Sequence, residues 1–232
     1  MKSLETAWKA ARRNFVPAIF LQTLMIALLI AYFFHSPTQH VLNILGEWKQ
    51  SFGYGFSFVT GAAAGGVLPE IIQVLFFQKG KILKRNFIHL LFGVIYWGCM
   101  GMIVDLFYRN QALWFGNTAD LKTIALKVCV DMFIYSAFFA CPVGVVLYRW
   151  RDRHFHFSAF REMLHPSFIR KNIFPTLVAN WVVWIPIVCV IYAMPSALQL
   201  PVCMIAEAFW VLMFATMSEL HSHRDISPIH SL

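Results

Sequence analysis

Long uncharged apolar runs alternate with short polar pieces along the chain. The first run, Phe15 to Phe34, has twenty residues without a charge, enough α-helix to cross about 30 Å of hydrocarbon. Later runs cover Gln50–Pro69, with apolar residues resuming after Glu70, then Phe87–Val104, Met132–Tyr148 and 172–206. The runs lack the period-two alternation of strands. The pattern predicts an all-α, polytopic membrane helical bundle.

The last apolar run is too long for one span. Pro195 and Pro201 are expected to divide it, because proline removes a backbone donor and clashes with the preceding helical turn. We predict spans over 172–193 and 200–220 with a very short outer loop between them. The bundle then has about six transmembrane helices.

Lys and Arg alternate between rich and poor polar pieces. Basic residues are frequent in four pieces, 1–14, 79–86, 149–171 and the tail after Leu220, which carry 15 of the 19. The pieces between them, 35–55, 105–127 and 194–200, carry the other four and are predicted to lie outside. Loops on the cytoplasmic-type side retain positive charge. The rich pieces are therefore predicted to lie inside, with both termini inside.

No linker is long enough to separate two domains, so residues 1–232 are predicted to form a single integral-membrane domain. Residues 1–55 would hold an N-terminal interfacial helix and a first span, 56–220 the core bundle and 221–232 a tail. The basic and aromatic stretch 149–171 is expected to be an amphipathic helix on the inner surface. A binding site for an acidic solute or a lipid headgroup is the alternative for this stretch.

Composition narrows the classes of function. The chain is 59% hydrophobic and 13% charged, with a net charge of +8. Because the charges lie at span ends rather than in one patch, we expect lipid headgroups and not nucleic acid as their partner. No metal-ligand spacing, phosphate-binding glycine loop or nucleophile–base set occurs. We therefore predict no catalytic residues, no metal, no cofactor and no enzymatic activity.

Glu70 is the first candidate for a site in the bundle. It is the acid that lies towards the inner half of a span, and no basic residue stands at its depth. Gln73 shares its helical face, beside Pro69 and Gly66. Charged groups inside a membrane are costly and usually face a partner or water. We therefore expect Glu70 and Gln73 to contact water or a solute.

The other candidates lie in later spans. Lys127 and Asp131 are four residues apart, so they can pair along one helical face. Glu207 lies in the outer part of the sixth span. Asn180 and Trp184 lie in the fifth, where Asn180 can also act as a hydrogen bond between helices. Pore lining and helix packing both remain open for these residues.

Small residues mark a close contact between helices. Gly61 and Gly65 form a small-xxx-small pair in the second span, and the third span carries Gly93, Gly98 and Gly101. Such residues let two backbones approach closely. The second span is therefore predicted to pack tightly against a neighbour.

Several of these motifs resemble the peroxisomal membrane protein 22 kDa family, also called the Mpv-seventeen family. The resemblance covers about residues 56–220 and rests on short motifs, which are Gly65-Gly66…Glu70…Gln73, Lys127…Asp131, Asn180…Trp184 with Pro186, and Pro195…Trp210. Pro69-Glu70 departs from the Gly-Asp usual in the family. Ala137, Gln199 and Val211 also depart, at a proline, an arginine and an asparagine of the family's pattern.

The resemblance implies a pore or channel-like membrane protein for small solutes, tied to organelles of eukaryotes. The sequence itself leaves a bacterial inner membrane or an organellar membrane open as the location. For such a pore we expect one connected aqueous path, and the partners are the lipid bilayer and small solutes. The path would be lined by Glu70, Gln73, Asp131, Asn180 and Glu207, with Lys127 and Trp184 as further pore-lining or solute-binding candidates. The alternative function is a non-conducting membrane scaffold or assembly factor that binds a partner through its basic inner face. The solute and a homo-oligomeric state stay open.

Overall fold

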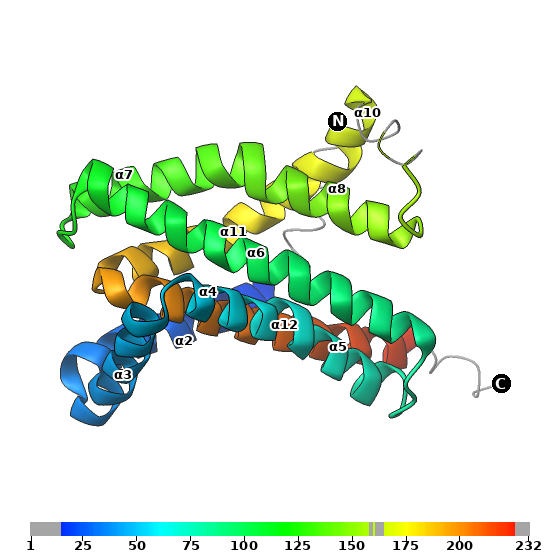
Figure 1. Ribbon diagram of the computed structural model, residues 1–232, viewed down its shortest axis with the longest axis horizontal. Helices are drawn as coiled ribbons and strands as arrows, with labels where there is room; N and C mark the ends of the chain where they lie inside the picture. The colour runs from blue at the N-terminus through cyan, green and yellow to red at the C-terminus, as the bar shows by residue number, and fades with distance from the viewer. Residues whose placement is uncertain (1–14, 158–159, 161–164, 226–232) are drawn as a thin grey trace. The chain divides into compact units, whose positions relative to one another are not determined.

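The computed structural model of the chain describes residues 15–157, 160 and 165–225, with side chains described up to residue 211. The described residues are almost entirely helical and include no strand (Figure 1). This confirms the all-α prediction. Five helical segments are long and apolar enough to cross a membrane, and a shorter apolar helix covers Ser196–Val211. These segments are compatible with a multi-pass membrane protein.

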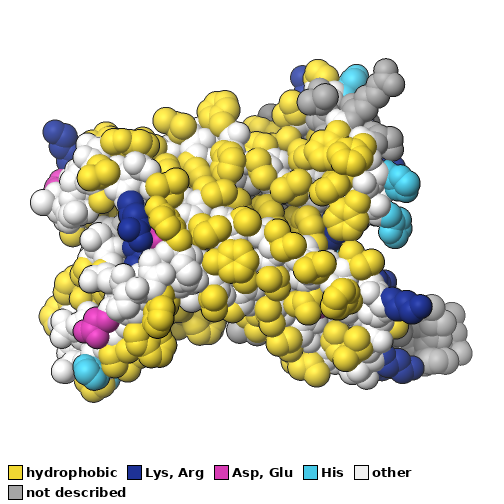
Figure 2. All heavy atoms as spheres, in the orientation of Figure 1, with side chains coloured by type: hydrophobic (Ala, Val, Ile, Leu, Met, Phe, Trp, Pro, Cys, Tyr) yellow, Lys and Arg dark blue, Asp and Glu magenta, His cyan; other side chains and the backbone are white. Residues whose placement is uncertain are grey.

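The five long segments are continuous helices or α-helices interrupted by wider π-helical turns. They are α2 (Phe15–Phe34); α4 (Tyr54–Gly61), η1 (Ala62–Val67), α5 (Leu68–Ile72) and η2 (Gln73–Phe77); α6 (Lys84–Phe115); α7 (Leu121–Val130), η3 (Asp131–Ala140) and α8 (Cys141–Asp152); and α10 (Pro166–Phe168), η4 (Ile169–Ile173) and α11 (Phe174–Ala193). Two further helices are α3 (Ser36–Phe52) and α12 (Ser196–Asp225). Figure 2 shows hydrophobic side chains over much of the visible surface.

The first predicted span matches α2, but later spans extend well beyond their predicted ends. The piece 105–127 was expected to be polar and outside the spans, yet α6 continues to Phe115 and α7 begins at Leu121. Gly116 ends α6 in a left-handed conformation with φ of 84°. Asp120 caps α7 by accepting a 3.0 Å hydrogen bond from the Thr123 backbone N–H.

Asp120 is also held by hydroxyl groups around the turn. The hydroxyls of Thr118 and Thr123 lie 2.5 and 2.8 Å from its Oδ2. These hydrogen bonds, that of Thr118 first, hold the pKa of the Asp120 carboxyl well below its usual range. Asp120, Thr118 and Thr123 therefore hold the short turn between α6 and α7 through hydrogen bonds with one another.

One further expectation for a polar piece was wrong, and one for the last apolar run was partly wrong. The 35–55 piece is largely helix α3 rather than a loop, and Leu42, Gly46 and Lys49 are buried on it. The long apolar run is divided at Pro195 as predicted, because α11 ends at Ala193 and α12 begins at Ser196. Pro201, however, lies inside α12, and the helix continues through it.

The stretch 149–171 does not form one amphipathic surface helix in its described part. Helix α8 ends at Asp152, and residues 153–157 form a turn in which His154 and Phe155 have φ of 53° and 61°. Residues 158–159 and 161–164 lie outside the described residues, as do the predicted interfacial helix within 1–14 and the end of the tail. A left-handed backbone at two successive residues is incompatible with a continued helix.

The chain divides into two compact units. Unit 1 comprises residues 1–35 and 111–196, and unit 2 comprises 36–110 and 197–232. In unit 1, α2 packs along α11, and Leu21, Met25 and Ile187 are fully buried. Gln22 joins the two helices, because its Nε2 donates to the carbonyl oxygens of Val182 and Val183 at 3.0 and 3.1 Å. The assignment of 1–232 to a single integral-membrane domain stays a prediction.

In unit 2, glycines bring the α4–η2 segment against α6. A Cβ on Gly61 would lie 2.5 Å from the Trp97 carbonyl oxygen, and one on Gly66 would lie 2.6 Å from the Gly93 backbone carbon. Real Cβ atoms do not approach backbone so closely, so the two helices touch through their main chains. The prediction of a close-packing surface at these glycines is confirmed, with α6 as the neighbour.

Candidate functional site

Four side chains of unit 1 form a buried polar cluster, called here the Lys127–Asp131 cluster: Gln111, Lys127, Asp131 and Tyr192. Gln111 is in the last turns of α6, and Tyr192 is near the end of α11. The Tyr192 hydroxyl donates to Asp131 Oδ2 at 2.7 Å and accepts from Gln111 Nε2 at 2.9 Å. Gln111 Nε2 also donates to the Lys127 carbonyl oxygen at 3.1 Å. Three helices therefore meet through this cluster.

The two charged groups of the cluster are not paired with each other. Lys127 Nζ lies 5.6 Å from the centroid of the Tyr192 ring, while Asp131 is bonded to the hydroxyl of the same tyrosine. Among the described residues, no ion pair involves either side chain. The direct Lys127–Asp131 pair expected from their spacing was therefore wrong. A long aromatic side chain from α11 contacts both groups instead.

The cluster is buried and incompletely satisfied. Lys127 is 1% exposed and Asp131 is 4% exposed. The amide oxygen of Gln111 is buried and has no hydrogen-bond partner. Buried polar groups without partners are uncommon because each forfeits its hydration without a replacement bond. The Lys127 ammonium, the unbonded amide oxygen of Gln111 and the Asp131 carboxylate therefore lie where the same three helices meet.

The wide turns of η3 are held by side chains of α11. Trp181 Nε1 donates to the Met132 carbonyl oxygen at 2.8 Å, and Asn180 Nδ2 lies 3.4 Å from Ser136 Oγ. A π-helix changes the usual i→i−4 pattern, and such turns are common at functional sites. Asp131 is the first residue of η3. The start of this π-helix and the Lys127–Asp131 cluster are therefore one structural feature.

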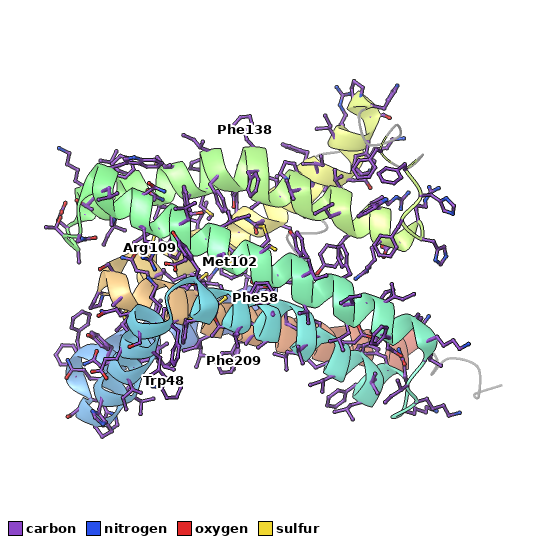
Figure 3. All side chains as sticks on the ribbon, viewed as in Figure 1. Trp48, Phe58, Met102, Arg109, Phe138 and Phe209 are labelled. Carbon is purple, nitrogen blue, oxygen red and sulfur yellow. The ribbon has the colours of Figure 1, made fainter. Side chains whose placement is uncertain are left out.

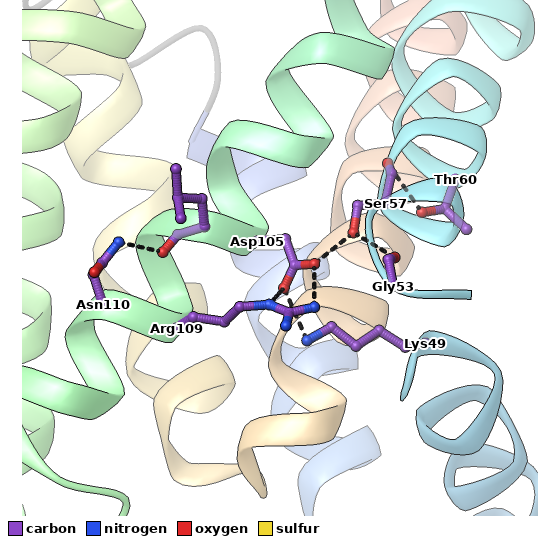
Figure 4. A network of polar contacts seen from close by, with 8 residues as sticks. Lys49, Gly53, Ser57, Thr60, Asp105, Arg109 and Asn110 are labelled. Atoms are coloured by element: carbon purple, nitrogen blue, oxygen red, sulfur yellow. Dashed lines mark hydrogen bonds and ion pairs between the residues drawn. The ribbon is translucent and has the colours of Figure 1, made fainter. Parts of the chain in front are cut away.

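A second cluster lies in unit 2 and is called here the Asp105 cluster: Lys49, Ser57, Asp105 and Arg109. Asp105 is fully buried on α6, and its two oxygens accept from three other side chains (Figure 4). Lys49 Nζ and Arg109 Nε lie 2.8 and 3.0 Å from Oδ1. Ser57 Oγ and Arg109 Nη2 lie 2.8 and 3.1 Å from Oδ2.

The Asp105 carboxylate already has a full set of hydrogen-bond donors within its cluster. The carboxylate has four donors, which is about all that its lone pairs accept. Lys49 is buried on α3, whereas the Arg109 side chain is 45% exposed and stacks 4.9 Å from the Tyr54 ring. Because one carboxylate holds two cations, it ties α3, α4 and α6 together. We therefore regard this cluster as a structural clasp.

Glu70, the first candidate from the sequence, has a partner. Asn86 Nδ2 donates a short hydrogen bond to Glu70 Oε1, and Asn86 Oδ1 accepts from the Leu83 backbone N–H at 2.6 Å. Asn86 therefore caps the start of α6 and holds the carboxylate at the same time. Glu70 is half-buried at the end of unit 2 that carries the basic turn between η2 and α6.

The candidates from the sequence fall in both units. Lys127, Asp131, Asn180 and Trp184 belong to unit 1, and Glu70, Gln73 and Glu207 belong to unit 2. The structure brings Lys127 and Asp131 together around Tyr192. Trp184, Gln73 and Glu207 are half-buried on their helices. One connected aqueous path along the candidates stays a prediction.

Sequence reasoning missed Gln111, Tyr192 and Asn86 as partners, and it missed the whole Asp105 cluster as a site. Asp105 and Arg109 have the same four-residue spacing as Lys127 and Asp131, and that signal could have found them. Lys49 is the lone basic residue of the 35–55 piece. The contacts of Tyr192 with Asp131 and Gln111 had no such signal.

Among the described residues, no group of three or more His, Cys, Asp or Glu side chains could hold a metal ion.

Comparison with protein-family models, with curated proteins and with solved structures finds no match for this chain.

Proposed function

We propose that this protein is a multi-pass membrane protein that lets small polar solutes cross the bilayer, with the Lys127–Asp131 cluster contacting the solute. The observation that carries the proposal is a buried ammonium without an ion-pair partner, beside a carboxylate and an open amide acceptor. Ionisable groups inside transmembrane segments usually mark solute or ion pathways, because their insertion is otherwise too costly. The resemblance to the Mpv-seventeen family is in line with this function.

The surroundings of the cluster fit a membrane-spanning segment. Lys127 lies on the α7–α8 segment, which is 32 residues long and apolar enough to cross a bilayer. Figure 3 shows Phe138 of η3 projecting away from the helices, and its side chain is 80% exposed. Such a side chain faces lipid if the segment spans a membrane. Glu70 is a weaker candidate for contacting the solute, because Asn86 already binds its carboxylate.

The flux of small solutes tests this proposal. In vesicles reconstituted with the purified protein, we expect Lys127→Met and Asp131→Asn each to lower permeation of glycerol or acetate at least tenfold. The reason is that each change removes a charge, and a hydrogen bond from a bound solute to a charged group is worth about 1.5–3 kcal/mol. Shrinkage of the vesicles, followed by light scattering, measures the permeation.

Lys49→Met is the matched control, since it applies the same substitution to another buried lysine that is ion-paired in the Asp105 cluster. Its permeation should stay within about twofold of the unaltered protein, and thermal unfolding in detergent must show that each variant is folded. If all three variants conduct alike, or if the unaltered protein conducts nothing, the transport proposal fails.

A non-conducting scaffold or assembly factor is the second candidate function. The Asp105 cluster favours it, because its charged groups bind one another and hold three helices together. Polar residues used in this way hold helices together. A protein that conducts nothing but retains a partner through its basic ends would fit this function.

We further propose six spans with both termini inside, α12 being the sixth. Reporter fusions after residues 45, 82, 116, 160, 197 and 232 should then alternate outside and inside, starting outside. The expectation follows from the distribution of Lys and Arg. Two successive fusions on one side would contradict six spans, and the fusions at 116 and 197 are the most informative because their loops are short.

A further inference from the structure

Helix α3 has three faces of different character. One face is buried in unit 2 and includes Gly46 and Lys49. A second face is apolar yet exposed, because Val41 is 58%, Trp48 53% and Phe52 68% exposed (Figure 3). These three residues are seven and four positions apart, so they share one side of the helix. We call them the α3 apolar strip.

The third face of α3 is polar. It carries His40, Glu47 and Ser51, which are all exposed. Each of them directly precedes a residue of the α3 apolar strip, so the two faces lie about 100° apart around the helix. A helix with an apolar side and a polar side is suited to the boundary between hydrocarbon and water, where it lies in the plane of the interface.

The neighbours of α3 along the chain fix its direction. Helix α2 ends at Phe34 and the α4–η2 segment begins at Tyr54, and both are long and apolar enough to cross a bilayer. A single residue, His35 or Gly53, separates α3 from each of them. Helix α3 has 17 residues and is therefore about 25 Å long. If both neighbours span, both ends of α3 stand at the same membrane surface, so the helix lies along that surface and cannot project into water.

Contacts within unit 2 hold α3 in one rotation about its own axis. Lys49 Nζ lies 2.8 Å from Asp105 Oδ1, and a Cβ on Gly46 would lie 3.0 Å from Leu198 Cδ2. The buried face is therefore fixed against α6 and α12, and the α3 apolar strip stays turned outward. The span that follows also exposes an apolar side chain, since Val59 of α4 is 65% exposed.

We propose that the α3 apolar strip is a lipid-binding surface that rests in the boundary between headgroups and acyl chains, so that α3 is an interfacial helix between the first two spans. Trp48 suits this position, because an indole ring buries its apolar body and keeps its polar N–H near the headgroups. Helix α3 carries one Glu and one Lys, and that lysine is ion-paired with Asp105. Binding therefore relies on apolar contact and needs no anionic lipid. The inference depends on a membrane location and not on solute transport.

Spin-label accessibility tests the proposal. The five cysteines are changed to alanine, and single cysteines on α3 are labelled with a nitroxide in phosphatidylcholine nanodiscs. The α3 apolar strip is probed by Val41→Cys, Trp48→Cys and Phe52→Cys. Their matched controls are the preceding residues of the polar face, His40→Cys, Glu47→Cys and Ser51→Cys.

Electron paramagnetic resonance compares collision of each label with oxygen, which partitions into hydrocarbon, and with a water-soluble nickel chelate. We expect the ratio of oxygen to nickel collisions to be roughly fivefold higher on the strip than on the polar face, because the strip lies about 5–10 Å into the interface. The same ratios should be found in phosphatidylglycerol, since no anionic headgroup is required.

Val59→Cys, on the exposed side of the following span, is the control for contact with lipid, and its ratio should match or exceed that of the strip. A second measurement needs no introduced cysteine, so it tests the proposal even if the cysteine variants do not fold. Phosphatidylcholine brominated near the carbonyl end of its acyl chains quenches tryptophan fluorescence on contact. The quenched fraction should be smaller for Trp48→Phe than for the unaltered protein.

Three results would overturn the proposal. Ready access of the nickel chelate to both faces of α3 would place the helix in water. Few collisions of either reagent with the α3 apolar strip would show that protein, such as a second copy of this chain, covers it instead of lipid. Access of the nickel chelate to Val59→Cys as well would show that the multi-pass assignment itself fails, and the interfacial position with it. None of these results depends on whether the protein conducts solutes.

Discussion

Asp105→Asn should destabilise the protein more than any other single change of charge in unit 2. The substitution removes the negative charge that holds Lys49 and Arg109, and Lys49 is 8% exposed. A buried cation left without its counter-charge costs about 3–5 kcal/mol. We expect a loss of about that size in the free energy of unfolding, measured by denaturation in detergent.

Two variants separate this effect from a general sensitivity to the substitution. Asp152→Asn makes the same change at a 54% exposed side chain paired with Arg151, and it should cost less than about 1 kcal/mol. The double variant Lys49→Met/Asp105→Asn removes both charges, so it should be more stable than Asp105→Asn alone. Strict additivity of the two single losses would contradict the clasp.

The second large effect is expected at the glycines between the α4–η2 segment and α6. Gly66→Ala places a methyl group 2.6 Å from the Gly93 backbone carbon, and Gly61→Ala places one 2.5 Å from the Trp97 carbonyl oxygen. Because the obstacle is backbone in both cases, a rotamer change cannot relieve it and the helices must separate. We expect each variant to lose about 3 kcal/mol of unfolding free energy.

Gly55 provides a matched control on the same helical segment. A Cβ there has no atom within 4 Å, so Gly55→Ala adds the same methyl group without a clash. It should be neutral or gain about 0.5–1 kcal/mol, since alanine loses less backbone entropy in a helix. If Gly61→Ala and Gly66→Ala behave like Gly55→Ala, the close approach of the two helices is wrong.

The sequence was enough to predict the helical class, the bounds of the first long apolar helix and the close-packing glycines. These features are local. An uncharged run of twenty residues forms a helix about as long as the hydrocarbon core is thick, and small residues four apart lie on the same face of a helix. The ends of the other spans were predicted less well. Helix α6 continues to Phe115 because no proline interrupts it before Gly116, although the first charge after its apolar run is Asp105.

The polar clusters could not be predicted in full, because their partners come from distant parts of the chain. Ser57 and Asp105 are 48 residues apart, and Tyr192 and Asp131 are 61 apart. A spacing of four residues shows only that two side chains share a face. It does not show whether a third group, here Tyr192, occupies the space between them. The same limit applies to Glu70, whose partner Asn86 belongs to the next helix.

The Asp105 cluster also fixes the axial positions of three helices relative to one another. Its carboxylate is on α6, a cation is on α3 and a hydroxyl is on α4. Sliding α6 along its axis by one turn, about 5.4 Å, would separate Asp105 from both Lys49 and Ser57. These three helices of unit 2 are therefore expected to shift together and not to slide past one another.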